Sequence, residues 1–409
     1  MKKSLLFAFI IALLSFSLFY ITSCNEIKVI IQNGENSFNS LSENDLNLLE
    51  KESFLNYAIL EGIYNKSIVL AVVGDIMVHS PQLTSAYLEN EGAYHFKDCF
   101  SYITSYLHKA DFAAGNLETT IAGREFGYSG YPFFNSPPEL ITALRESGFH
   151  LLFTANNHSM DRGEKGVINT INYLEEECSG FVGTARNQEE RERGFMLSQN
   201  GIKVAFFAYT YGTNGIPLPS GKEYLVSLID EQLIEEDIIR AKQIQEADLV
   251  VVALHWGEEY QRLPSSYQKE LARKLVDMGA DIIIGGHPHV IQPAEIIKTE
   301  KGEGLCLYSL GNFISNQRWR YSDSGVIVYL KLQLNPALNT SQVTLLEIIP
   351  TWVHKFLQEG KWKYTVLPVR EVLETENAKE IYKLSNRDYQ RLQEVQEETE
   401  EIFWRFWYN

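Results

Sequence analysis

The feature that most limits what this chain can fold into is the alternation of short apolar runs with amphipathic segments. A continuous, branched apolar run of strand length occupies residues 67–73, and similar runs recur at residues 149–154, 203–209, 249–254, 281–284 and 304–310. Such runs are typical of strands buried on both faces of a sheet. Between them, apolar residues recur three and four positions apart, which predicts helices over residues 98–109, 138–147, 164–178, 230–246 and 265–278. The alternation indicates an α/β fold with covered sheets.

The composition narrows the classes of protein and partner. The chain has 409 residues, of which 45% are hydrophobic and 22% charged, and this excludes a disordered, collagen-like or coiled-coil chain. Asp and Glu outnumber Lys and Arg by 53 to 36, and no basic run is present. We therefore expect no nucleic-acid partner. An anionic substrate would need local cations or a metal ion.

The first 24 residues predict an export signal. Lys2 and Lys3 precede an uncharged apolar run over residues 4–20, which is too short and too unevenly flanked for a membrane span. Residues 21–24 resemble a bacterial lipobox, and this resemblance implies that Cys24 is lipidated. The alternative is an uncleaved N-terminal anchor. Either way, we expect an extracytoplasmic, membrane-anchored protein.

The remaining chain divides into segments of different composition and residue pattern. Residues 25–66 are polar and predict a tether followed by a short helix, and residues 67–350 predict the main domain. Alternating residues after 325 predict antiparallel strands within that domain. Residues 351–409 predict a mainly helical C-terminal extension that ends in an aromatic cluster. We expect this cluster to pack on the domain; the alternative is a contact with a partner or a membrane surface.

Polar side chains able to bind a metal or a phosphate follow nearly every predicted strand. They lie in segments 74–79, 115–118, 154–161, 255–259, 285–289 and 311–313. Because ligands of α/β sheets bind beyond the carboxyl ends of the strands, we expect these segments to converge on one rim. Carboxylate, amide oxygen and imidazole together suit Mn, Fe or Zn better than Mg or Ca.

In chain order these segments contain Gly-Asp-Ile-Met, Asn-Leu-Glu, Ala-Asn-Asn-His-x-x-Asp, His-Trp-Gly-x-Glu, Gly-x-His-Pro-His and Ser-Leu-Gly-Asn-Phe. This order resembles the bacterial capsule-synthesis CapA family, associated with poly-γ-glutamate capsules and similar in turn to calcineurin-like metallophosphoesterases. The resemblance covers about residues 68–316. It implies a four-layer α-β-β-α sandwich of two mixed sheets with a metal centre at the strand ends.

The resemblance also implies roles for individual residues. The implied metal ligands are Asp75, Asn116, Glu118, Asn157, His255, His287 and His289. His158 is the implied general acid or transition-state donor. Asp161 is placed to orient His158, or to cap a helix instead. Glu258 or Glu259 is a candidate base or a partner of a metal-binding imidazole.

Two departures from the phosphoesterase pattern bear on the number of ions. That superfamily usually begins with Asp-x-His and has Gly-Asp in its second motif, whereas here Met77 and Asn116 hold those positions. We therefore expect one or two ions of Mn, Fe or Zn. For substrate binding we single out Arg124, which is otherwise an ordinary surface residue, Trp256 as a wall of the cleft, and Asn312.

The leading functional hypothesis is an exported lipoprotein that acts as a metal-dependent hydrolase or transferase in capsule synthesis, attachment or export. The expected partners are an anionic polymer or a phosphorylated or acylated small substrate, the membrane through a lipid anchor, and capsule-synthesis membrane proteins. One alternative is a non-catalytic scaffold that binds the polymer. Another is a general extracytoplasmic metallophosphoesterase.

Overall fold

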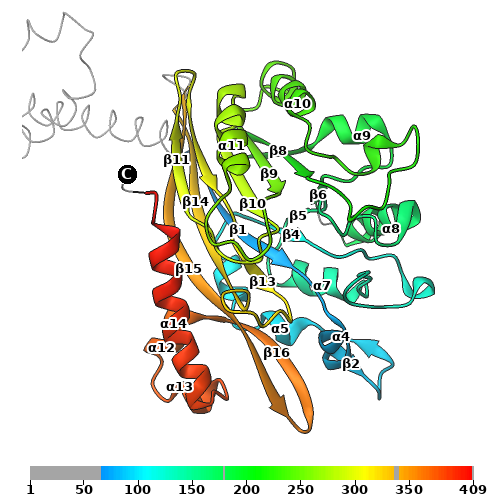
Figure 1. Cartoon of the computed structure of the whole chain (residues 1–409), viewed down its shortest axis with the longest axis vertical. Helices are drawn as coiled ribbons and strands as arrows, with labels where there is room; N and C mark the ends of the chain where they lie inside the picture. Colours follow the sequence, from blue (N-terminus) through cyan, green and yellow to red (C-terminus); the bar gives the residue numbers. More distant parts are fainter. Residues whose placement is uncertain (1–65, 178–179, 336–339, 408–409) are drawn as a thin grey trace, which may run out of the picture. The chain divides into compact units, whose positions relative to one another are not determined.

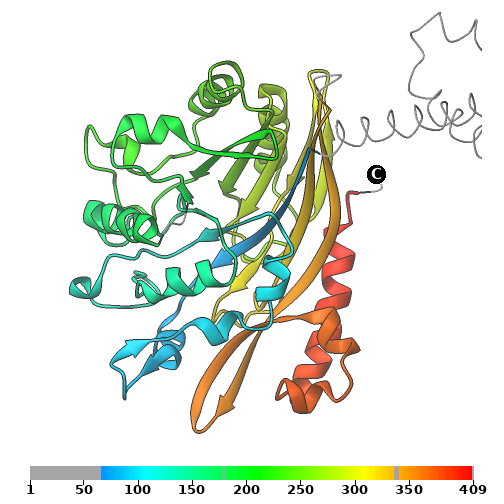
Figure 2. The ribbon, with the colours of Figure 1, turned by 180° about the vertical axis from the view of Figure 1, so that it is seen from behind.

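Two mixed β-sheets face each other across a shared apolar core (Figures 1 and 2). The computed structural model describes residues 66–177, 180–335 and 340–407. The predicted signal, the lipidated Cys24 and the tether lie outside these residues. Among the helices that are described, none is both long and apolar enough to traverse a bilayer.

The first sheet has the order β16-β15-β14-β1-β4-β5-β6, and β13 also pairs with β1. Its strands β1, β4, β5 and β6 are parallel, whereas β14, β15 and β16 are added antiparallel. The strands are β1 Ser67–Ile76, β4 Phe112–Leu117, β5 Leu151–Phe153, β6 Gly180–Val182, β13 Asn312–Ile314, β14 Ser324–Asn335, β15 Thr340–Gln358 and β16 Lys361–Pro368.

The second sheet has the order β11-β12-β10-β9-β8-β7, with parallel central strands and antiparallel edges. Its strands are β7 Phe195–Gln199, β8 Ile202–Thr210, β9 Leu249–His255, β10 Ile282–Gly286, β11 Ala294–Lys298 and β12 Glu303–Leu307. A small separate hairpin joins β2 Tyr87–Leu88 and β3 Ala93–Tyr94.

Helices cover the outer face of each sheet. The first sheet carries α4 Ser80–Ala86, α5 Lys97–Phe100, α6 Thr104–Leu107, α7 Glu139–Glu146 and part of α8 Gly163–Glu176. The second carries α10 Glu231–Gln243 and α11 Ser266–Met278. The connections contain η2 Arg124–Phe126, α9 Gln188–Arg193 and η3 Glu223–Leu225.

The continuous apolar runs follow from this layering. In β1, Leu70 and Val72 pack between the sheets, whereas Ala71 and Val73 pack beneath the helices. Successive side chains of a strand point to opposite faces, so a strand covered on both faces needs an apolar residue at every position. The predicted four-layer α-β-β-α arrangement of two mixed sheets is confirmed.

The C-terminal region differs from the predicted division at residue 350. Strand β15 crosses that position, and β16 extends the sheet to Pro368, so the helical part begins only with α12. Trp352 lies on the same face of β15 as Ile348, which packs between the sheets. The helices that follow are α12 Val369–Glu374, α13 Ala378–Ile381 and α14 Asn386–Phe403, and they pack on Trp352 and Leu367.

The aromatic cluster at the C-terminus packs on the domain, as expected. Phe403 is fully buried in the core between the sheets, and Trp404 and Trp407 pack against that core. The Phe406 ring packs against the apolar layer of the second sheet. Figure 2 shows α14 lying along the long strands β14 and β15.

Candidate metal centre

The carboxyl ends of β1, β4, β9 and β10 bring the predicted polar segments together. Strand register places Asp75 opposite both Asn116 and Asn312, and places His255 opposite Gly286. These segments lie far apart in the chain, but parallel pairing puts their polar ends at one rim.

Asp75 lies at the base of this rim and joins the two sheets. Asn116 donates an amide hydrogen bond to Asp75 Oδ1 at 2.8 Å. Asp75 Oδ2 accepts from the backbone N–H of His287 at 3.2 Å and lies 2.9 Å from His289 Nδ1. A Cβ at Gly286 would lie 2.5 Å from Asp75 Oδ1, so glycine is required for this close approach.

Glu118 is fully buried beside Asp75, and both of its carboxylate oxygens lack a hydrogen-bond partner among the described residues. Its Oε1 lies 3.5 Å from His255 Nε2 and 3.7 Å from His289 Nε2. Burial, and then the charges of Asp75 and Glu259, raise the pKa of the Glu118 carboxyl well above its usual range. A buried carboxylate in this position is stabilised by a cation.

Two histidines at the rim, His255 and His287, are held neutral. Burial, together with His287 and His289, lowers the pKa of His255 well below its usual value. Burial and His289 lower the pKa of His287 to about 3. Metal ions bind the neutral imidazole, so these shifts keep both rings in the metal-binding state.

The backbone at two of the histidines is strained. His287 and His289 have φ angles of 94° and 57°, in the left-handed region that side chains other than glycine rarely adopt. Such strain persists where the surrounding structure holds it, and it is concentrated at functional sites. The Nδ1 atom of His287 has no hydrogen-bond partner within the described part of the chain.

Two overlapping triads of these residues fit a cation. In each triad one ligand atom per residue lies within 4.8 Å of the others; the triads are Glu118, His287 and His289, and Asp75, Glu118 and His255. Glu118 is common to both. Buried acceptors without donors, a carboxylate with a raised pKa and neutral imidazoles together match a divalent metal site of the Mn, Fe or Zn class.

Asn157 and Asn116 complete the surroundings of His255. The Oδ1 of Asn157 lies 3.0 Å from His255 Nε2, and the Nδ2 of Asn116 lies 3.2 Å from His255 Nδ1. Both predicted amide residues therefore lie beside the metal-binding groups. Sequence analysis did not single out Asn156, whose amide donates to the Leu117 carbonyl at 2.8 Å and whose Oδ1 accepts from the His158 backbone N–H.

His158 and Asp161 form a buried pair next to this cluster. The Asp161 Oδ2 lies 2.8 Å from His158 Nδ1, and it also accepts the backbone N–H of Phe134 at 2.6 Å. The Phe134 ring meets the imidazole edge-on with centroids 4.6 Å apart. Of the residues that the structure describes, none hydrogen-bonds His158 Nε2, so this nitrogen is available to a substrate.

Two tyrosines that the sequence did not indicate flank the histidines. The Tyr211 ring lies 4.6 Å from the His287 ring, and the Tyr260 ring lies 6.1 Å from the His289 ring. Their exposures of 46% and 38% are high for large aromatic side chains. Exposed aromatic faces beside a polar centre are typical of ligand-binding surfaces.

Trp256 does not line a cleft. It is fully buried in the apolar layer between the second sheet and its helices, and its indole donates to the Tyr308 carbonyl at 3.0 Å. Side chains alternate along a strand, so the residue after His255 points to the opposite face. The structure therefore contradicts the predicted substrate contact of Trp256.

Three other candidates take different positions from those expected. Glu258 is exposed and contacts Gln261 only through its backbone carbonyl, whereas the charge of Glu259 acts on Glu118. Arg124 is exposed on η2, and its electrostatic neighbours are Tyr94 and Tyr128. Asn312 is fully buried with Oδ1 3.1 Å from His289 Nδ1, so it positions a histidine.

Comparison with known proteins identifies the family of this chain. Residues 69–317 match the family described as "Bacterial capsule synthesis protein PGA_cap". The capsule biosynthesis protein CapA of Bacillus anthracis is 31% identical over 310 residues, covering 73% of this chain and 70% of that protein. The PGA biosynthesis protein CapA of Bacillus subtilis (strain 168) is 30% identical over 299 residues, covering 69% and 73% respectively.

Proposed function

This chain belongs to the PGA_cap family of bacterial capsule synthesis proteins, and on that premise we propose that it is a metal-dependent hydrolase or transferase acting on a poly-γ-glutamate-like capsule polymer. The observation that carries the proposal is the Glu118 carboxylate, which is buried among Asp75 and three imidazoles and has no hydrogen-bond partner among the described residues. The reaction would serve synthesis, attachment or export of the polymer.

The metal would be held by Asp75, Glu118, His255, His287 and His289, with the Asn157 amide oxygen beside them. When bound, an ion of the Mn, Fe or Zn class supplies a Lewis acid that polarises a phosphoryl or acyl oxygen. The two triads share Glu118, which suits one ion or a pair of ions.

His158 is the proposed proton donor. Asp161 accepts a hydrogen bond from His158 Nδ1–H, which fixes the ring orientation and leaves Nε2 as the atom that exchanges a proton with the leaving group. The edge-on contact with Phe134 holds the ring in place. General acid catalysis of this kind contributes roughly 10²–10⁴-fold in rate.

The tyrosines give the proposed binding surface for the chain of the substrate. Tyr211 and Tyr260 lie against His287 and His289 and remain partly exposed. An anionic polymer would place its charged group at the metal and its aliphatic stem on these rings; a phosphorylated or acylated small substrate would use the metal in the same way. Capsule-synthesis membrane proteins are the proposed protein partners.

The proposed location is extracytoplasmic, on a membrane through lipidated Cys24. This part rests on the uncharged apolar run and the lipobox-like residues 21–24. Mass spectrometry of the protein purified from membranes would test it. A mature N-terminus at an unmodified residue other than Cys24 would contradict it.

The deciding experiment combines metal content, turnover and capsule formation. The purified full chain should contain at least one divalent ion and hydrolyse an aryl phosphate ester or a γ-glutamyl polymer when supplied with Mn²⁺. His158→Asn should abolish turnover and capsule while metal content and thermal stability stay at the wild-type level. Capsule retained in both His158→Asn and His287→Ala strains would support a scaffold, and aryl phosphate turnover with normal capsule would support a general metallophosphoesterase.

A further inference from the structure

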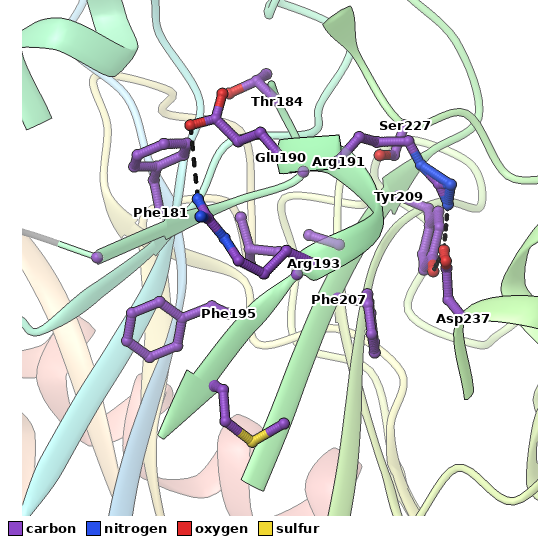
Figure 3. Close-up of a pocket in the computed structure, with 16 residues that line it drawn as sticks. Phe181, Thr184, Glu190, Arg191, Arg193, Phe195, Phe207, Tyr209, Ser227 and Asp237 are labelled. Atoms are coloured by element: carbon purple, nitrogen blue, oxygen red, sulfur yellow. Dashed lines mark hydrogen bonds and ion pairs between the residues drawn. The ribbon is translucent and has the colours of Figure 1, made fainter. Parts of the chain in front are cut away.

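A second pocket, separate from the metal centre, lies where the edge strands β6 and β7 of the two sheets approach each other (Figure 3). Its volume is about 330 Å³. Small-molecule sites commonly span about 300–1,000 Å³, so the pocket is large enough for a small ligand. Residues from β6, α9, β7, β8 and α10 line it, and we call it the Arg191 pocket after its most buried cation.

Arg191 lacks acceptors for much of its guanidinium. Its side chain is 4% exposed and donates through Nη2 to Asp237, but its Nε and Nη1 atoms have no partner among the described residues. Asp237 also accepts hydrogen bonds from Tyr209 Oη at 2.7 Å and from Arg240 Nη1 at 2.5 Å, so it is shared among three donors. Buried N–H groups without acceptors are rare in native proteins, so an acceptor is missing here.

The charges of the pocket lining limit the charge of a ligand. The lining contains two cations, Arg191 and Arg193, and two anions, Glu190 and Asp237, so it carries no net charge. A monoanion can use the free N–H donors of Arg191, whereas the second charge of a phosphate dianion would meet no further cation.

A free hydroxyl lies beside the guanidinium. Ser227 is 6% exposed and lines the pocket, and its side chain makes no hydrogen bond within the described part of the chain. Figure 3 shows Ser227, Arg191 and Tyr209 at one end of the pocket. This end therefore offers N–H and O–H donors together.

Apolar side chains line much of the rest of the pocket, and they include Phe181, Phe195, Met196 and Phe207. Figure 3 shows the Arg193–Glu190 ion pair at the same end as Phe181 and Phe195. Gly194 lets the backbone pass close to Phe207, because a Cβ at this position would lie 2.6 Å from the Phe207 ring. Aromatic and thioether groups of this kind pack against a flat or aliphatic body.

We propose that the Arg191 pocket binds a small monocarboxylate with an apolar body, its carboxylate on Arg191 and Ser227 and its body against Phe207 and Met196, which lie on the same face of the second sheet. The site is independent of the proposed hydrolase function. Carboxylates accept strong, charge-assisted hydrogen bonds from guanidinium groups, which matches the missing acceptor.

Phenylacetate is the probe for this site, measured by calorimetric titration of the full chain in detergent. We expect saturable binding with one site per chain. Phenylacetamide has the same shape without the charge, and phenyl phosphate carries a second charge; each should bind at least about 10-fold more weakly. Equal or tighter binding of either analogue, or the absence of saturable phenylacetate binding, would overturn the proposal.

Two variants locate the site. Arg191→Lys keeps the ion pair with Asp237 but removes the extra N–H donors, and it should weaken phenylacetate binding about 10-fold or more. Met196→Trp fills the apolar part of the pocket from β7 instead of α9, and it should abolish binding even if Arg191→Lys folds poorly. Arg391→Lys, which alters an Arg–carboxylate pair on α14, is the matched control and should bind like wild type. Wild-type affinity in both pocket variants would refute this assignment.

Discussion

The metal centre and the Arg191 pocket are both buried polar clusters, but they lack opposite kinds of partner. Among the described residues, the Glu118 carboxylate oxygens and His287 Nδ1 have no hydrogen-bond partner in the metal centre. In the Arg191 pocket the corresponding atoms are Nε and Nη1 of Arg191. Since native interiors satisfy nearly all buried polar groups, the kind of atom left over indicates the ligand. A cation fits the first cluster and an anion fits the second.

Removing the unpartnered carboxylate should have the largest effect. We expect Glu118→Gln to weaken divalent metal binding by more than about 100-fold, because loss of a ligand exceeds the roughly 10–100-fold effect of losing a group that only supports one. Metal-dependent turnover should disappear. Elemental analysis after gel filtration measures the first effect and aryl phosphate hydrolysis the second.

The exposed neighbour Glu259 provides the control for Glu118. Glu259→Gln should retain the metal. After treatment with a chelator, Glu118→Gln should be at least as stable as the wild-type protein, because the variant no longer buries the Glu118 charge. If the Glu118→Gln protein still bound the metal at the wild-type level, the unpartnered Glu118 carboxylate would not indicate a cation site.

A smaller effect is expected from the carboxylate that holds His158. Asp161→Asn should lower turnover about 10–100-fold, as carboxylate partners of functional imidazoles typically contribute. It should also move the alkaline limb of the pH–rate profile to lower pH, because a proton donor must be protonated and the imidazolium loses its hydrogen-bonded counter-ion. Metal content should be unchanged.

Asp230→Asn is the matched substitution for Asp161→Asn. Asp230 caps α10 through a hydrogen bond to the Leu233 amide at 3.0 Å, and asparagine caps helices equally well. Activity and stability of this variant should match the wild type. Loss of metal in Asp161→Asn would show that the His158 pair belongs to the metal cluster itself.

The sequence revealed the two clusters unequally. Asp75, Glu118, Asn157, His255, His287 and His289 follow apolar runs, and parallel strands bring such positions together. The Arg191 pocket gives no comparable signal, because α9 reads Gln-Glu-Glu-Arg-Glu-Arg, the pattern of a solvated helix. Only the tertiary structure shows that Arg191 and Glu190 turn inward.

The errors at the metal centre have local physical causes. Trp256 follows His255 directly, and strand alternation sends it into the apolar layer. Glu258 and Glu259 are adjacent, and spacing alone cannot tell which one faces Glu118. Tyr211 and Tyr260 lie in loops where no periodicity fixes the direction of a side chain. The predicted boundary at residue 350 divides β15. Beyond this position, Trp352 and Leu367 are covered by α12, α13 and α14 instead of by the second sheet.

Acid should affect the stability contributed by the histidines of the metal centre but not the affinity of the Arg191 pocket. Burial, followed by the charges of His289, His158 and Arg318, lowers the pKa of His79 to about 4, while His287 lies at about 3. A histidine has a pKa of about 6.5 in the unfolded chain, so the unfolded state binds more protons between these values. The stability contributed by the neutral histidines is complete above about pH 6.5 and is lost as the pH falls toward 4.

Thermal unfolding of the chelated protein at pH 7, 5.5 and 4.5 measures this loss, which we expect to be on the order of 1–3 kcal/mol. His79→Gln should reduce the slope. The Arg191 pocket has no histidine among its lining residues, so phenylacetate affinity should change little over the upper part of this range. A phenylacetate affinity that fell in parallel with stability would mean that both clusters respond to one titration.

The smallest expected effect tests whether the clusters are independent. Ser227→Ala should weaken phenylacetate binding by about 3–10-fold, the size of one neutral hydrogen bond, with metal content unchanged. The two regions do touch, because a Cβ at Gly183 would lie 2.7 Å from the Ala155 amide, directly before Asn156 and Asn157. Binding at one site therefore has a route to the other, and any coupling must be reciprocal. We expect chelation to change phenylacetate affinity by less than about 2-fold, because none of the proposed metal ligands lines the pocket. A larger change, matched by an equal effect of phenylacetate on Mn²⁺ affinity, would make the pocket a regulatory site of the metal centre.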